Sequence, residues 1–107
     1  MCGIFGVVSK NSINQDELEL LARHAEQRGK DSSGLFFSNT LGYDIHRADT
    51  PITALLKRVS TATTGFVMGH SRLITNGLAD NQPVYRDGVC VVHNGIVVNH
   101  EALWEQL

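Results

Sequence analysis

The 107 residues carry a net charge of −2, and 42% of them are hydrophobic. This balance argues against nucleic acid or an anionic membrane as a partner, and the length fits one small domain over residues 1–107. The segment Ile4–Val8 is too short for the core of a signal peptide, and Cys2 and Cys90 form neither a disulfide framework nor a metal-type pair. We therefore expect a cytoplasmic protein.

The expected elements alternate between strands and short helices. Asn14, with Glu17 three positions later, resembles a capping box and predicts the start of a helix. In the first half of the chain we expect a strand at 3–8, a helix at 15–27, a loop at 29–34 and strands at 35–37 and 43–47. A helix at 51–59, capped by Thr50, a strand at 65–69 and a loop at 71–83 should follow. The chain should then form a hairpin of 89–92 with 96–98 around Asn94-Gly95, and a helix after Asn99. This order favours a layered α/β or α+β architecture.

The last predicted helix carries apolar side chains to the end of the sequence. Trp104 and Leu107 offer apolar surface that no later element of this sequence covers. The strand at 3–8 is a continuous apolar run, typical of a strand that is buried on both faces. Because a complete domain buries such surfaces between its layers, we expect the chain to be a fragment whose fold is only partly represented.

Cys2 directly follows the initiator methionine. Removal of Met1 would place a thiol and a free α-amino group on the same residue. An α-amino group titrates at about pH 7.7 to 8.0 and can accept the thiol proton, so Cys2 could supply both nucleophile and base. Its position also fits a small hydrophobe that opens a buried strand.

The pair Asn94-Gly95 has two interpretations. Between β-branched runs it is a strong signal for a tight turn. The asparagine amide and the glycine N–H could also form an oxyanion hole, provided that a nucleophile lies nearby. Cys2 is the obvious candidate for that nucleophile.

Polar residues follow the strand predicted at 65–69. Arg72 could hold a carboxylate through two parallel hydrogen bonds, and Thr75 and Asn76 could bind the backbone groups of an amino acid. An ordinary solvated turn explains the same residues. The glycine-bounded polar loop at 28–34 is similarly ambiguous.

No metal or cofactor is expected. The five histidines show no ligand spacing typical of a metal site, so we assign no metal ligands. The sequence contains neither the phosphate-binding nor the dinucleotide-binding glycine motif, and Cys90 lies in a predicted strand where a thiol is usually inert.

Four segments, taken together and in this order, resemble the glutaminase domain of class II glutamine amidotransferases, a branch of the N-terminal nucleophile hydrolases. They are Met-Cys-Gly-Ile-Phe-Gly at 1–6, the loop at 28–34, His-Ser-Arg at 70–72 and His-Asn-Gly at 93–95. The resemblance covers essentially the whole chain, which would then be the N-terminal portion of such a domain. It implies an α+β fold, the αββα four-layer sandwich of the N-terminal nucleophile hydrolases.

The resemblance also implies the chemistry. Cys2, freed of Met1, would attack the side-chain amide of glutamine with its own amine as general base. Asn94 and Gly95 would stabilise the oxyanion, ammonia would leave, and water would hydrolyse the glutamyl thioester to glutamate.

Further roles follow by the same resemblance. Arg72 would bind the α-carboxylate of glutamine, with Thr75 and Asn76 lining the same pocket. Arg28 and Gly29 would position the N-terminus. In the family, the carboxylate that holds the α-amino group lies further along the chain than Leu107.

The acceptor of the ammonia stays open. Leu73 and the stretch 81–85 are more similar to the asparagine synthetase type, whereas 93–101 is more similar to the sugar-phosphate aminotransferase type. In either case a downstream acceptor domain of the parent polypeptide would receive the ammonia, and homo-oligomers are compatible with this reading. Two alternatives remain: a non-catalytic scaffold that binds glutamine or a partner protein, and an N-terminal nucleophile amidase that acts on another amide.

Overall fold

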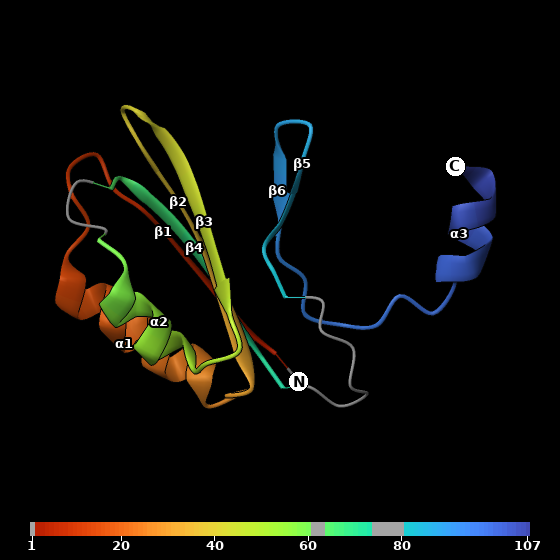
Figure 1. Cartoon of the computed structure of the whole chain (residues 1–107), viewed down its shortest axis with the longest axis horizontal. Coiled ribbons are helices and arrows are strands. Elements are labelled where there is room, and N and C mark those ends of the chain that lie inside the picture. Colours follow the sequence, from red (N-terminus) through yellow and green to blue (C-terminus); the bar gives the residue numbers. More distant parts are fainter. Residues whose placement is uncertain (1, 61–63, 74–80) are drawn as a thin grey trace.

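The computed structural model describes residues 2–60, 64–73 and 81–107. Two helices cover one face of a four-stranded antiparallel sheet, and a two-stranded sheet stands on the other side (Figure 1). The elements are β1 (Gly3–Val8), α1 (Gln15–Glu26), β2 (Ser32–Asn39), β3 (Gly42–Ala48), α2 (Ile52–Arg58), β4 (Phe66–Arg72), β5 (Val84–Arg86), β6 (Val89–Val91) and α3 (His100–Gln106). The architecture is α+β, as expected.

The strand order of the larger sheet, β1-β4-β2-β3, decides where the site lies. Gly3 of β1 pairs with Ser71 of β4, and Arg72 of β4 pairs with Ser32 of β2. The start of β1, the end of β4 and the start of β2 therefore meet at one end of the sheet. Residues that precede β1 or follow β4 consequently share that end.

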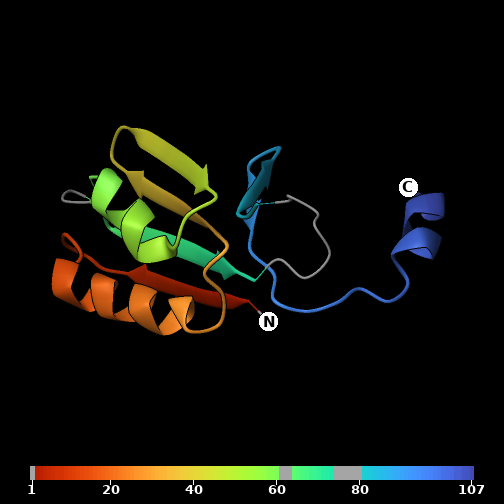
Figure 2. The same ribbon diagram turned by 60° about the horizontal axis from the view of Figure 1, so that its bottom comes forward.

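Helices α1 and α2 lie against one face of the larger sheet (Figure 2), and the hydrophobic core fills the space between them and the sheet. Leu18 and Leu35 are fully buried there, and complete burial of such a side chain contributes about 1.5 to 3 kcal/mol. The buried members of the core are Ile13, Leu18, Ala22, Leu35, Phe37, Ile52, Leu55 and Val67. This core holds α1 and α2 firmly on one face of the sheet.

The predicted start of α1 is confirmed. The side-chain oxygen of Asn14 accepts hydrogen bonds from the backbone N–H groups of Asp16 (2.9 Å) and Glu17 (3.1 Å). These bonds satisfy two of the donors that a helix N-terminus leaves unpaired. The helix itself ends at Glu26, one residue earlier than predicted.

The predicted hairpin around Asn94-Gly95 is wrong. The hairpin in this region joins β5 to β6 through Asp87 and Gly88, which have φ angles of 50° and 82°. Two successive residues with positive φ match the right-handed twist of the flanking strands, so this dipeptide makes the turn. Asn94-Gly95 lies outside any strand, and residues 96–98 are not a strand.

Other local predictions need correction as well. The predicted loop at 29–34 is shorter, because Ser32 to Gly34 already pair with β4 as the first residues of β2. Thr50 does not cap α2; its backbone carbonyl accepts a hydrogen bond from the Ser33 hydroxyl at 2.7 Å. Asn99 precedes α3 as predicted, but its side chain makes no capping hydrogen bond.

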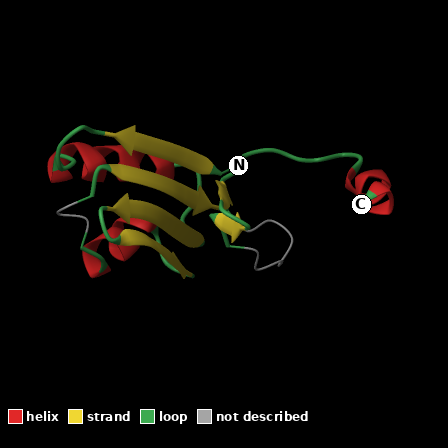
Figure 3. Cartoon of the chain, turned by 90° about the horizontal axis from the view of Figure 1, so that it is seen from above, coloured by secondary structure: helices red, strands yellow, loops and turns green. Residues whose placement is uncertain are grey.

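Helix α3 lies apart from the rest of the molecule (Figure 3). None of its residues is buried, and Trp104 is 71% exposed. Among the residues that the structure describes, no helix has the length and apolar character needed to cross a bilayer.

Candidate active site

One end of the four-stranded sheet collects the site residues predicted from the sequence. Cys2 precedes β1, Arg72 ends β4, and Arg28 and Gly29 follow α1. Asn94 reaches the same end from the segment after β6, as its bond to Cys2 shows. Thr75, Asn76 and Met1 lie outside the described residues.

Cys2 and Asn94 are in direct contact. The backbone N–H of Cys2 donates a hydrogen bond to Oδ1 of Asn94, with 3.1 Å between nitrogen and oxygen. Because Oδ1 is the acceptor in this bond, the other arm of the carboxamide, Nδ2, remains as a donor group. The same side chain thus binds the nitrogen of Cys2 and presents an N–H group beside it.

A pocket of about 340 Å³ opens beside this contact. Its size is at the lower end of the range typical of small-molecule sites, about 300 to 1,000 Å³. The thiol-bearing residue, the carboxamide of Asn94 and the side of α1 all contribute to its wall. The lining residues are Cys2, Gly3, Ile4, Phe5, Leu21, His24, Ala25, Arg28 and Asn94.

Gly29 fixes the loop after α1 to the end of β4. Its carbonyl accepts a hydrogen bond from the buried Ser71 hydroxyl, and the Asp31 N–H donates to the carbonyl of Arg72 at 3.0 Å. A Cβ atom at position 29 would collide with the backbone of Arg72 and Leu73. Only glycine therefore allows this close approach, which also brings Arg28 to the pocket wall.

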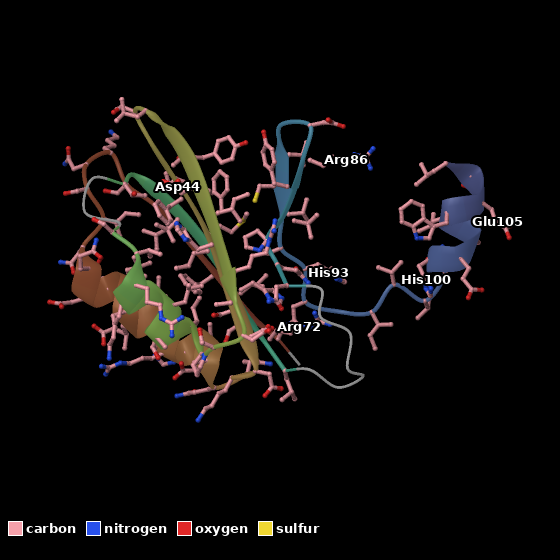
Figure 4. The ribbon with its side chains drawn as sticks, in the orientation of Figure 1. Asp44, Arg72, Arg86, His93, His100 and Glu105 are labelled. Atoms are coloured by element: carbon pink, nitrogen blue, oxygen red, sulfur yellow. The ribbon has the colours of Figure 1, made fainter. Side chains whose placement is uncertain are left out.

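Arg72 is the last residue of β4, one position beyond Ser71, the partner of Gly3. In Figure 4 it lies at the lower end of the four-stranded sheet. Its guanidinium is a fixed positive charge at this end of the sheet, but Arg72 is not among the residues that line the pocket.

His70 and Gln82, to which the sequence analysis assigned no role, also belong to this region, and both bind the backbone of His93. His70 of β4 is fully buried, and its Nε2 lies 3.2 Å from the carbonyl oxygen of His93. Burial, together with the nearby charge of Arg72, lowers the pKa of His70 below its usual value. Oε1 of Gln82 accepts a hydrogen bond from the His93 N–H at 2.6 Å. Both histidines belong to the four motifs, but their bonds involve backbone atoms that no motif signals.

The second cysteine differs from Cys2 in its surroundings. Cys90 lies in β6, and burial raises the pKa of its thiol. A raised pKa lowers the thiolate fraction at neutral pH and hence the reactivity. Within the described residues, no group of three or more His, Cys, Asp or Glu side chains could hold a metal ion.

Comparison with known proteins shows what the chain is similar to. No family model matches the chain. Seventy-nine curated proteins match it, and those named glutamine–fructose-6-phosphate aminotransferase (isomerizing) align over its whole length. The chain is thus related to the class II glutamine amidotransferases, which confirms the resemblance drawn from the four motifs.

The particular relatives are bacterial. The protein from Agrobacterium fabrum is 37% identical to the chain, that from Pseudomonas syringae pathovar tomato 36%, and that from Rhizobium leguminosarum biovar viciae 35%. Each alignment covers 100% of this chain and 18% of the relative. The chain therefore spans about a fifth of the length of these relatives.

Proposed function

We propose that this chain is a glutaminase domain that hydrolyses the side-chain amide of glutamine to glutamate and ammonia through a thioester on Cys2. The hydrogen bond between the Cys2 nitrogen and Asn94 Oδ1 carries the proposal. It brings together the three groups that such chemistry needs: a thiol, the nitrogen that becomes its base, and a carboxamide donor.

The first step is the activation of the thiol. Once Met1 is removed, the nitrogen that now donates to Asn94 becomes the α-amino group of Cys2. The amine accepts the thiol proton, directly or through one water, and the thiolate attacks the side-chain carbonyl carbon of glutamine. A carbon–sulfur bond forms and the carbonyl electrons move to oxygen.

The second step is the collapse of the tetrahedral intermediate. Nδ2 of Asn94 and the N–H of Gly95 stabilise the negative oxygen, which such donors do by about 3 to 4 kcal/mol each. The carbon–nitrogen bond breaks, and the leaving ammonia takes the proton held by the α-ammonium group. Water then adds to the thioester, releases glutamate and restores the thiol.

Arg72 selects the substrate in this proposal. Its guanidinium binds the α-carboxylate of glutamine, and Thr75 and Asn76 complete the same pocket, while Arg28 and Gly29 hold the end of the sheet in shape. The support from the structure is the position of Arg72 after Ser71, which pairs with the residue that follows Cys2. Another N-terminal nucleophile amidase would not need a free α-carboxylate, so substrate comparison separates the two readings.

We further infer an acceptor for the ammonia. The relatives are named for transfer to fructose 6-phosphate, and this chain spans 18% of their length. In this proposal the ammonia passes to a downstream acceptor domain that binds a sugar phosphate. An aspartyl acceptor, as in asparagine synthetases, is the alternative.

The four-layer αββα sandwich is the complete fold that we propose. The described residues supply one helical layer, the four-stranded sheet and, on the other side of that sheet, the two-stranded sheet of β5 and β6. The sheet face away from the helices bears exposed apolar side chains, with Ile4 48% and Val8 78% exposed. Such a face is stable in water only when another layer covers most of it, and a second sheet fits this requirement.

The test is glutamate release from glutamine by the purified protein, with the mass of its N-terminus measured in parallel. We expect active protein to lack Met1 and Cys2→Ala to release no glutamate while keeping the wild-type circular dichroism. Cys90→Ala is the matched control, because it removes the other thiol, and it should retain full activity.

Three results would contradict the proposal. They are full activity in Cys2→Ala, full activity in protein that retains Met1, and calorimetric binding of glutamine without any release of ammonia. The last result would instead support a non-catalytic glutamine-binding scaffold.

A further inference from the structure

The peptide that leads into Asn94 is held from two sides. The His93 N–H donates to Oε1 of Gln82 at 2.6 Å, and the His93 carbonyl lies 3.2 Å from Nε2 of His70. A carbonyl oxygen can only accept a hydrogen bond, so Nε2 of His70 must carry a proton. Both polar groups of residue 93 are therefore bonded to side chains of other segments.

His70 is a rigid anchor for this peptide. It is 0% exposed and lies on β4, between β1 and β2, paired with Ile4 of β1 and Gly34 of β2. Its Nδ1 is buried without a hydrogen-bond partner among the residues that the structure describes. A proton on Nδ1 would create a buried, unpaired charge, so the ring stays neutral with its one proton aimed at His93.

Gln82 is anchored in turn by the sheet. Nε of Arg47 on β3 donates to the carbonyl of the adjacent Pro83 at 2.8 Å, and Nδ2 of Asn81 donates to Oδ1 of Asp49 at 3.0 Å. The carbonyl of Gln82 occupies the space that a side chain at Gly34 would fill. The segment 81–83 is thus fitted against β2 and β3, and its glutamine side chain is aimed at residue 93.

We propose that His70 and Gln82 are positioning residues that fix Asn94 beside the nitrogen of Cys2. Residues 92–99 contain no helix or strand, so side-chain bonds must set the position of Asn94. Neither His70 nor Gln82 is among the residues that line the pocket. They act on catalysis only through the peptide of His93. This inference rests on the proposed glutaminase activity.

The expected effect follows from the geometry of oxyanion stabilisation. Displacement of a catalytic donor by about 1 Å can lower the rate by about 100-fold. We expect His70→Leu and Gln82→Leu each to lower kcat by about 10- to 100-fold, with KM changed by less than about threefold. Because both bonds hold the same peptide, the double variant should lose less than the product of the two single losses.

The experiment measures kcat and KM for glutamate release in the purified protein. It also measures the rate at which iodoacetamide alkylates Cys2, because a general loss of structure would change that rate as well. Alkylation of Cys2 by iodoacetamide needs no oxyanion donor, so its rate should stay within about threefold of wild type. His70→Gln supplies an amide donor to the His93 carbonyl, and Gln82→Glu retains the acceptor. Both should recover most of kcat.

His100→Gln is the matched control. The His100 ring also meets a backbone carbonyl, that of Val97 at 3.3 Å, but it lies at the exposed start of α3. This variant should keep wild-type kcat. The positioning role is refuted if His70→Leu and Gln82→Leu both fold and keep kcat within about twofold of wild type. A wild-type protein that releases no glutamate refutes the proposed function itself, and the positioning role with it.

Discussion

Asn94→Asp separates the two tasks that the structure gives to one carboxamide. The aspartate keeps Oδ1, the atom that accepts the hydrogen bond from the Cys2 nitrogen at 3.1 Å. It replaces the donor Nδ2 by a second oxygen with negative charge. Asn94→Ala removes the acceptor and the donor together. A comparison of the two variants therefore tests the oxyanion role apart from the structural contact.

The magnitudes of the two effects differ enough to be told apart. The bond to the Cys2 nitrogen lies at an exposed site, where such a bond contributes about 0.5 to 1.5 kcal/mol to stability. Loss of an oxyanion donor costs about 2.7 to 4 kcal/mol, or about 100- to 1,000-fold in kcat. We expect Asn94→Asp to lose at least about 100-fold in kcat, because its charge also repels the oxyanion, with little change in the free energy of unfolding.

The assay follows glutamate formation at saturating glutamine and unfolding in urea for each variant. Asn99→Asp is the matched control, because Asn99 is exposed and its side chain makes no capping bond to α3. It should retain the wild-type kcat. The oxyanion role of Asn94 is refuted if Asn94→Asp turns over glutamine within about threefold of wild type.

Three further predictions concern stability. The pKa of His70 is lowered in the fold, so below about pH 6.5 the unfolded chain binds more protons than the folded one. The free energy of unfolding should therefore decrease as the pH is lowered, by at most about 1.4 kcal/mol per pH unit. Urea titrations at several pH values should show a weaker pH dependence in His70→Gln. Leu35→Ala removes a fully buried core side chain and should cost about 2 to 5 kcal/mol of unfolding free energy; a loss below about 1 kcal/mol would contradict the assigned core. Gly29→Ala should lower the free energy of unfolding by about 1 to 3 kcal/mol, because the new Cβ meets the backbone of Arg72. Gly6→Ala is the control and should cost less than about 1 kcal/mol, because the nearest atom to its Cβ would lie 3.6 Å away. Equal melting temperatures for the two variants would be inconsistent with the close approach at Gly29.

Local signals predicted the fold well where neighbouring residues decide it. The cap of α1 involves only Asn14 and the two N–H groups that follow, so the sequence pattern identified it correctly. Turn residues were less informative, because both Asp87-Gly88 and Asn94-Gly95 satisfy the pattern of a two-residue hairpin. The side chain of Asn94 instead forms a hydrogen bond with Cys2. These two residues are too far apart in the sequence for a short sequence pattern to include both.

The candidate site, too, was predicted only in part. The motifs predicted that Asn94 would lie beside Cys2, and the two are joined by a hydrogen bond, while the register of β1 with β4 brings Cys2 and Arg72 to the same end of the sheet. His70 and Gln82 were not predicted as functional, because they bind the backbone of His93. Every residue has the same backbone N–H and carbonyl groups, so the residue type at position 93 does not indicate these bonds. Only the tertiary structure reveals such supports.

The separation of Cys2 and Asn94 has a consequence for the newly made chain. The two residues are 92 positions apart, so their contact depends on the tertiary structure and closes a long loop. Under the proposed function, a polypeptide in which Asn94 has not yet reached Cys2 exposes the thiol without its amide neighbour and would not hydrolyse glutamine. In that proposal, hydrolysis of glutamine begins only when the tertiary structure has brought the two residues together.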